Sequence, residues 1–262
     1  MNKRILGGLA ALLLTAGLAG AASAETIRVG VSAGPHAEIL EQVRKVAAQD
    51  GLDIKIIEFT DYVVPNTALA SGDIEANSFQ HLPYLENQVK DRGFKLVSVG
   101  QTVVFPMGFY SKKVKSFDEL PEGATVAIQN DPTNGGRSLL LLQAKGVIKL
   151  RDGVGLKPTL LDIAANPKKL RLIELDAAQL PRSLDDVTAA AVNTNYAVEA
   201  GLDPVKDAIA REDAESPYTN IIAVREQDKH KPWVAALLKA YHTQPVKDFI
   251  QTRFKGAVVT SW

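Results

Sequence analysis

Apolar and polar positions follow two alternating periods along most of the chain. Residues 26–31 and 52–59 alternate with the period of a β-strand. Between them, the apolar residues at positions 39–47 recur at the spacing of one helix face, after Gly34-Pro35, which is typical of a helix start. Strand, helix and strand within so few residues predict a βαβ unit with parallel strands and a right-handed crossover.

The next segment combines short elements with one unusually long extended stretch. The pattern predicts a helix over 66–70, a strand over 74–79 and a helix over 83–91 that ends near Gly93. Residues 95–110 form one extended stretch that is interrupted at Pro106 and is long for a strand. This stretch is interpreted as a segment that passes from one lobe to another.

A second α/β unit follows, and the chain then returns to the first. The predicted elements are strands over 124–128, 170–173 and 189–192, a loop over 130–136, and helices over 137–145 and from Asn193 to Gly201. Residues 221–224 are predicted to be a returning strand, followed by helices over 233–241 and 246–254. The pattern predicts an α/β fold with two lobes, each a mainly parallel sheet flanked by helices, and a ligand cleft between the lobes. Lobe 1 would comprise 25–105 plus 222–262, and lobe 2 would comprise 106–221.

The N-terminus has the features of an exported protein. Lys3 and Arg4 precede an uncharged apolar run, and Ala22-Ser23-Ala24 has the form of a cleavage site. These features predict a signal peptide over residues 1–24, cleaved after Ala24, and a periplasmic location. The competing interpretation is a membrane anchor, because the uncharged run from residue 5 to 24 is just long enough to span a bilayer.

Composition narrows the classes of function. The 30 basic and 30 acidic side chains balance, and removal of the leader would leave a charge of −2, so nothing favours binding to nucleic acid or to an anionic membrane surface. The chain contains no cysteine, which excludes disulfides and a lipid anchor on cysteine. The mature protein is therefore expected to diffuse freely.

Arg137 is the strongest candidate for anion binding. It follows Asn134-Gly135-Gly136 at a predicted helix start, where glycines allow close approach of the backbone and the helix dipole favours negative charge. A guanidinium can bind a carboxylate through two parallel hydrogen bonds. The alternative is a capping loop with a solvated Arg137. A phosphate loop is disfavoured, because no lysine follows the glycines.

Aromatic and amide side chains gather near predicted strand ends, where an open α/β sheet binds ligands. Tyr62, Phe79 and Tyr84 are notable in a chain with only 6% aromatic residues, although packing in the core is the alternative. His81 is a structural residue or a ligand contact, and the spacing of the histidines does not favour a metal site. Asn193 and Asn220 can hydrogen-bond both ends of a zwitterion, or can serve in turns and caps.

Evidence for catalysis is sparse. The chain has no G-x-S-x-G nucleophile motif and no cysteine nucleophile. Glu58 and Asp61 are two nearby carboxylates, which is a weak signal for acid–base chemistry. We therefore predict a binding protein without catalytic activity, cofactor or metal.

Five ordered motifs carry a resemblance to a known family. Residues 59–66, 77–85, 130–142, 193–196 and 216–220 resemble the MetQ/NlpA family of periplasmic substrate-binding proteins of methionine ABC transporters, over essentially the whole mature chain. The resemblance implies a type 2-like, two-lobed receptor that closes on L-methionine and delivers it to an ABC permease with ATPase subunits. A monomer is expected.

The resemblance also implies roles for individual residues. Tyr62, Phe79 and Tyr84 would line a thioether pocket, and His81 would lie beside them. Arg137 would hold the ligand carboxylate, and Asn193 and Asn220 would bind the amino-acid head group.

Three alternatives stay open at the level of sequence. The ligand could be D-methionine, a methionine derivative, a short peptide or another apolar amino acid. A secreted enzyme that uses Glu58, Asp61 or His81 is a second alternative. A surface or adhesion protein that uses the fold only as a scaffold is the third.

Overall fold

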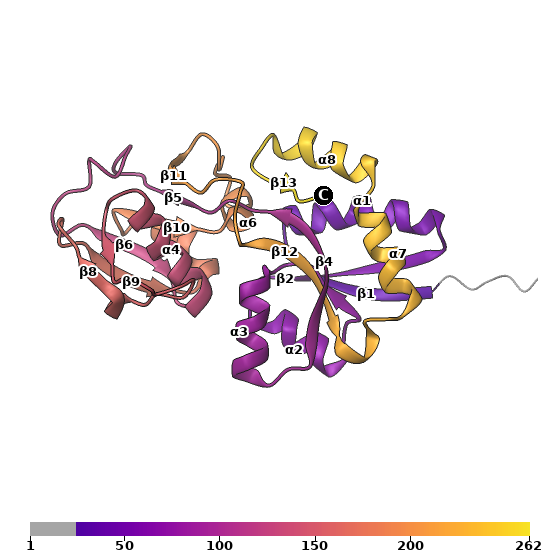
Figure 1. Ribbon diagram of the computed structural model, residues 1–262. Coiled ribbons are helices and arrows are strands. Elements are labelled where there is room, and N and C mark those ends of the chain that lie inside the picture. The colour runs from indigo at the N-terminus through magenta and orange to yellow at the C-terminus, as the bar shows by residue number, and fades with distance from the viewer. Residues whose placement is uncertain (1–24) are drawn as a thin grey trace, which may run out of the picture.

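The computed structural model describes residues 25–262, and the predicted signal peptide over residues 1–24 lies outside the described residues. Two lobes lie side by side and are joined by two crossing segments (Figure 1). Lobe 1 is built on a six-stranded sheet in the order β13-β4-β12-β3-β1-β2, and lobe 2 on a five-stranded sheet in the order β11-β5-β10-β6-β9. The predicted α/β class with two lobes is confirmed.

Lobe 1 begins with the predicted βαβ unit. β1 and β2 pair in parallel over eight positions, and Gly34 at φ 74° lets the chain turn from β1 into α1. The elements of this lobe are β1 (Glu25–Ser32), α1 (Pro35–Gln49), β2 (Leu52–Phe59), α2 (Val64–Ser71), β3 (Ala76–Asn77), α3 (Leu82–Arg92), β4 (Leu96–Val104), β12 (Thr219–Arg225), a 3-10 turn (Glu226–Asp228), α7 (Pro232–Tyr241), α8 (Gln244–Phe254) and β13 (Val259–Thr260).

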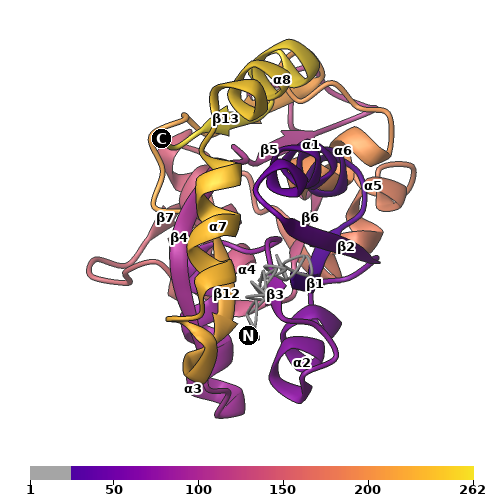
Figure 2. The same cartoon turned by 90° about the vertical axis from the view of Figure 1, so that its right-hand side faces the viewer.

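Each face of the lobe 1 sheet has its own apolar core. Ile222 and Val224 of β12 pack into the core that α1, α7 and α8 cover, whereas Ile221 and Ala223 pack into the core under α2 and α3. This alternation follows from the two-residue period of a strand. Helices therefore lie on both sides of the sheet (Figure 2).

Lobe 2 is formed by the middle of the chain. Its elements are β5 (Gly108–Tyr110), β6 (Thr125–Gln129), α4 (Pro132–Ala144), β7 (Lys149–Leu150), a 3-10 turn (Leu160–Asp162), β8 (Ile163–Ala165), β9 (Arg171–Leu175), a second 3-10 turn (Ala177–Gln179), α5 (Leu180–Ser183), β10 (Ala189–Val192), α6 (Thr194–Glu199) and β11 (Ala208–Arg211). β7 and β8 form a separate two-stranded sheet. The central strand β6 alternates in the same way as β12, because Val126 and Ile128 face one core and Ala127 faces the other.

The prediction of mainly parallel sheets needs correction, because both sheets are mixed. β1 is parallel to β2 and β3, and β6 is parallel to β9 and β10, but β12 runs antiparallel to β3 and β4. In lobe 2, β5 is antiparallel to β10 and β11. The reason is topological: one crossing segment leaves lobe 1 after β4, the other re-enters it before β12, and strands that leave and return side by side must run in opposite directions.

Two predicted element boundaries also differ. The strand predicted over 74–79 is reduced to Ala76–Asn77. The loop predicted over 130–136 is mostly helical, because α4 begins at Pro132, five residues before its predicted start. Arg137 is consequently inside a helix and not at its first residue.

Each crossing segment connects a strand of the lobe 1 sheet to a strand of the lobe 2 sheet. The chain leaves the lobe 1 sheet after β4 and enters the lobe 2 sheet at β5, and it returns between β11 and β12. The residue boundaries that the sequence predicts for the lobes remain a prediction. Over residues 25–262, no helix combines the length and the apolar character required to cross a membrane.

Candidate ligand-binding site

The first turn of α4 carries polar side chains towards lobe 1. The Asp131 carboxylate caps this helix by accepting hydrogen bonds from the backbone N–H groups of Thr133 (3.2 Å) and Asn134 (2.9 Å). Gly135 packs against the end of β6, since a Cβ there would lie 2.7 Å from the carbonyl oxygen of Gln129. The glycine therefore permits a close approach that fixes where Asn134 and Arg137 lie.

A cavity between the lobes brings all the predicted site residues together. It holds about 350 Å³ of empty space, including the part open to solvent. The lining residues are His36, Tyr62, Phe79, Gln80, His81, Tyr84, Phe105, Asn134, Arg137, Asn193, Asn195 and Asn220. That these side chains bind a ligand remains a prediction.

One wall of the cavity is aromatic. The ring centroids of Tyr62, Phe79 and Tyr84 are 6.0–6.3 Å apart, and the pairs that include Tyr84 meet edge to face. The Tyr84 hydroxyl donates to the backbone oxygen of Tyr62 (2.9 Å), which fixes one ring relative to the other. The three rings form the apolar, polarisable surface that a thioether prefers.

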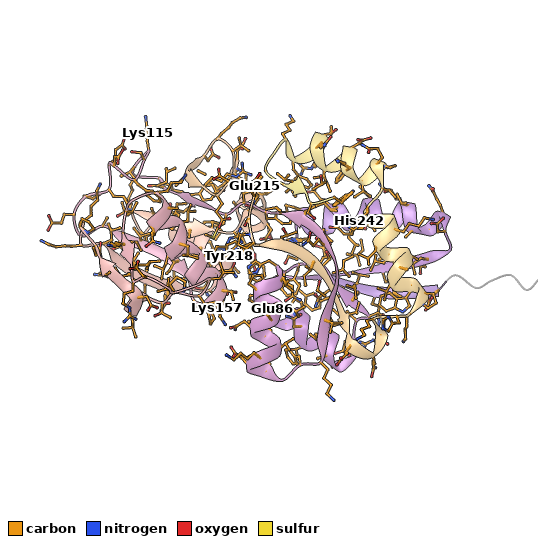
Figure 3. The ribbon with its side chains drawn as sticks, viewed as in Figure 1. Glu86, Lys115, Lys157, Glu215, Tyr218 and His242 are labelled. Carbon is orange, nitrogen blue, oxygen red and sulfur yellow. The ribbon has the colours of Figure 1, made fainter. Side chains whose placement is uncertain are left out.

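Direct hydrogen bonds join the two lobes around this wall. The Tyr62 hydroxyl of lobe 1 donates to Oδ1 of Asn195 in α6 (2.5 Å), and the Tyr196 hydroxyl donates to the backbone oxygen of Thr60 (3.1 Å). At the outer edge, Lys157 Nζ donates to Oδ1 of Asn87 in α3 (2.9 Å). Lys157 lies in Figure 3 at the edge of lobe 2 that faces α3.

His81 has a structural contact and a contact within the cavity. Its Nδ1 accepts from the backbone N–H of Tyr84 (3.1 Å), so Nε2 carries the proton in the neutral ring and can donate to Oδ1 of Asn134 (3.3 Å). Burial, together with the nearby charge of Arg137, lowers the pKa of His81 to about 3. The ring is therefore neutral at ordinary pH.

The two predicted asparagines both line the cavity and come from the ends of different strands, with Asn193 directly after β10. Asn193 donates to Oδ1 of Asn134 (3.0 Å) and accepts from Nε2 of Gln129 (2.7 Å). Asn220, at the start of β12, lies opposite His81 in an isolated antiparallel bridge. Both side chains are buried, so their amides are held in fixed directions.

The Arg137 guanidinium is not free to bind a ligand carboxylate through two parallel hydrogen bonds, because it is already paired within the protein. Its side chain is only 3% exposed and binds both carboxylate oxygens of Glu212, with Nε to Oε1 at 2.7 Å and Nη2 to Oε2 at 2.5 Å. Nη2 also donates to the backbone oxygen of Phe105 (2.9 Å). Within residues 25–262, neither Glu212 nor Phe105 accepts a hydrogen bond from Nη1. A ligand carboxylate would therefore accept mainly from Nη1.

Sequence reasoning missed His36, which follows the exit of β1. The ring is 4% exposed, lies 4.3 Å from the Phe105 ring and has the Asn220 side chain as its polar neighbour. Burial lowers its pKa to about 3. The available signal was its position, because the carboxyl ends of parallel strands are where this class of fold binds ligands.

The two acids considered for catalysis lie outside the cavity lining. Oδ1 of Asp61 accepts from the backbone N–H groups of Val63 (2.7 Å) and Val64 (2.9 Å) and so stabilises the turn into α2. Glu58 is an exposed residue of β2. Neither carboxylate is placed to act on a molecule in the cavity.

The chain is similar in sequence and in structure to several known proteins. The D-methionine-binding lipoprotein MetQ of Yersinia pestis is 50% identical over 100% of this chain and 99% of its own length, and its counterpart in Escherichia coli (strain K12) is 53% identical over 90% and 88%. A nutrient-binding protein from Burkholderia cenocepacia, solved bound to methionine, is 58% identical with a TM-score of 0.88, covering 90% of this chain and 100% of that one. The family model of the NlpA lipoproteins matches residues 27–262. The chain therefore belongs to the NlpA lipoprotein family.

Proposed function

We propose that this protein is a substrate-binding receptor that captures L-methionine in the interlobe cavity and delivers it to an ABC importer. One observation carries the proposal: a single cavity combines an aromatic wall, neutral amides and one guanidinium. Those are the groups that the side chain, ammonium and carboxylate of methionine require. The names of the relatives support the same ligand, since they are described as methionine-binding.

Each end of the ligand has a proposed partner. Tyr62, Phe79 and Tyr84 pack around the thioether, with His81 at the edge of this wall. Nη1 of Arg137 donates to the carboxylate. Asn193 and Asn220 bind the head group, and their amide oxygens accept from the ammonium.

The ligand is proposed to favour closure because it contacts both lobes. A ligand shifts an open–closed equilibrium only by its differential affinity for the two states, and contacts with both lobes supply that difference. Residues 25–105 plus 222–262 and residues 106–221 are the proposed lobes. The extended crossing segments over Gln101–Phe109 and near Asn220 are the proposed hinges.

The chirality of the ligand is the main alternative within this proposal. Relatives are named for D-methionine, so the D-enantiomer is the first competitor to measure, followed by methionine derivatives, short methionine peptides and other apolar amino acids. The proposal also includes export to the periplasm, a monomeric receptor and recognition by a permease with ATPase subunits. The expectation of a protein without a lipid anchor is at odds with the names of the relatives, which are lipoproteins.

Calorimetric titration of refolded protein tests the function. The purified protein is unfolded to remove any bound ligand, refolded, and titrated with L-methionine and then with D-methionine. We expect a dissociation constant for L-methionine of about 1 µM or lower, which corresponds to about −8 kcal/mol. Methionine recovered chemically unchanged after incubation would count against an enzyme, and the absence of heat from folded protein would refute the proposal.

A variant pair tests the site. Arg137→Gln removes the proposed carboxylate donor and should weaken L-methionine binding by about a hundredfold or more. Arg182→Gln removes an exposed guanidinium from α5 and serves as the matched control, with affinity equal to that of the wild type. Equal affinities of the two variants would remove Arg137 from the binding site.

A further inference from the structure

Glu212 is a buried carboxylate behind the cavity wall. It lies on the crossing segment that follows β11, is 12% exposed and binds Arg137 through both oxygens. Its Oε2 also accepts from the backbone N–H of Met107 (2.9 Å), and its own N–H donates to the Met107 oxygen (2.9 Å). The carboxylate is thus held in place by partners on the other crossing segment and on α4.

Glu212 reaches the cavity only through Arg137. It is not a lining residue of the cavity and lines instead a separate groove on the outer side, together with Tyr218. The Arg137 guanidinium lies over the Tyr218 ring at 4.4 Å, and Tyr218 lies between the lobes in Figure 3. Arg137 and Tyr218 therefore form the wall that separates a ligand from Glu212.

Arg137 is the one formally charged residue that lines the cavity in the described part of the chain. No aspartate or glutamate is among the lining residues, and the two lining histidines, His36 and His81, are buried and neutral because burial lowers the pKa of each to about 3. Among the lining residues the charge that a ligand meets is thus that of Arg137, which Glu212 offsets from directly behind it. A second carboxylate behind the lining, that of Asp131, accepts from Nδ2 of Asn134 (2.8 Å) and stays the same in every variant used below.

We propose that Glu212 is a specificity-determining residue that offsets the positive charge of Arg137 and thereby selects a net-neutral zwitterion over an anion with the same side chain and carboxylate. The inference rests on the proposed function and deepens it. In a cavity screened from water, an uncompensated guanidinium repels the ligand ammonium and attracts any free carboxylate. With Glu212 in place, a ligand that lacks the ammonium brings an uncompensated negative charge into a buried site, which is unfavourable.

The test compares two ligands of nearly equal shape. L-methionine and its 2-hydroxy acid analogue share the thioether and carboxylate, but the hydroxyl replaces the ammonium, so the analogue is a net anion. The measured quantity is the ratio of their dissociation constants in calorimetric titrations. The wild type should strongly prefer L-methionine, and Glu212→Gln should reduce that preference by about tenfold or more. Asp213→Asn removes the same charge from an exposed neighbour and should leave the ratio unchanged.

The outcomes separate the two proposals. A folded Glu212→Gln variant with the wild-type ratio would overturn the role of Glu212, even though methionine still binds. A wild-type protein that binds neither ligand would overturn the proposed function instead. Glu212→Asp, which keeps the charge, should keep the wild-type ratio even if both ligands bind more weakly. A shifted ratio in that variant would also overturn the inference, and this arm decides the question if the glutamine variant does not fold.

Discussion

Replacing Arg137 with methionine should lower the free energy of unfolding by about 4 kcal/mol, and replacing Glu212 with glutamine at the same time should restore most of that loss. The reason is that the single substitution leaves the Glu212 carboxylate buried without its cation. The double substitution removes both charges, so no buried charge is left. A glutamine at position 212 can still accept from the backbone N–H of Met107.

The magnitude follows from the contacts of the pair. Breaking a buried ion pair by removing one partner costs about 3–5 kcal/mol, and the 12% exposure of Glu212 lets water relieve part of it, so about 3 kcal/mol is expected. The backbone oxygen of Phe105 also loses its donor, which adds about 1 kcal/mol. In the double variant only this second loss remains, so its stability should lie within about 1–2 kcal/mol of the wild type.

Urea denaturation of ligand-free protein, followed by circular dichroism, measures these differences. Lys112→Met is the matched control, because Lys112 pairs with Asp185 at the surface, where an ion pair contributes about 0–1 kcal/mol. If the single and double variants were equally unstable, the loss would come from packing and not from an isolated carboxylate. A single variant as stable as the wild type would show that the buried pair contributes nothing to folding.

Three further predictions concern other parts of the site. Tyr62→Phe removes a hydrogen bond of 2.5 Å between the lobes and should weaken L-methionine binding about fivefold, with little change in melting temperature, as titration and thermal melts can show. His36 and His81 have pKa values of about 3 when folded but about 6.5 when unfolded, so stability should fall as pH drops from about 6.5 towards 3, and urea titrations at pH 7 and pH 5 measure the loss. Gly135→Ala places a Cβ 2.7 Å from a backbone oxygen and should lower stability by about 1–3 kcal/mol while weakening binding, whereas Gly146→Ala, which meets open space, isolates the cost of its positive φ.

Local periodicity predicted most of the fold. The apolar stripe over 39–47, after Gly34-Pro35, predicted α1, and the length of the extended stretch over 95–110, with Pro106 inside it, marked the passage between lobes. The start of α4 was misplaced because Asn134-Gly135-Gly136 is typical of a loop. These glycines are helical because the helix packs closely on β6 and on residues 156–158, a tertiary contact that local sequence does not report.

The site, like the fold, could be predicted only in part from the sequence. The positions of Tyr62, Phe79, His81, Tyr84, Arg137, Asn193 and Asn220 near strand and helix ends indicated one cavity, and the structure places all seven around it. The partner of Arg137 could not be predicted, because Glu212 lies 75 positions further along the chain in a segment without a recognisable motif. His36 was missed although its position after β1 was a signal, because the packing of its ring against Phe105 at the cavity is a tertiary contact.

The interrupted course of lobe 1 has a consequence for the order of folding. Lobe 2 is made from one continuous stretch, whereas the main core of lobe 1 needs Ile222, Val224, Trp233 and the helices α7 and α8 from the last part of the chain. We expect lobe 2 to form its core as soon as its own residues are available, and lobe 1 to stay incomplete until the C-terminal residues arrive. A chain that emerges N-terminus first would therefore leave the edges of β3 and β4 unpaired until β12 is made, and a truncation after β11 should yield a folded lobe 2 joined to an unfolded N-terminal segment.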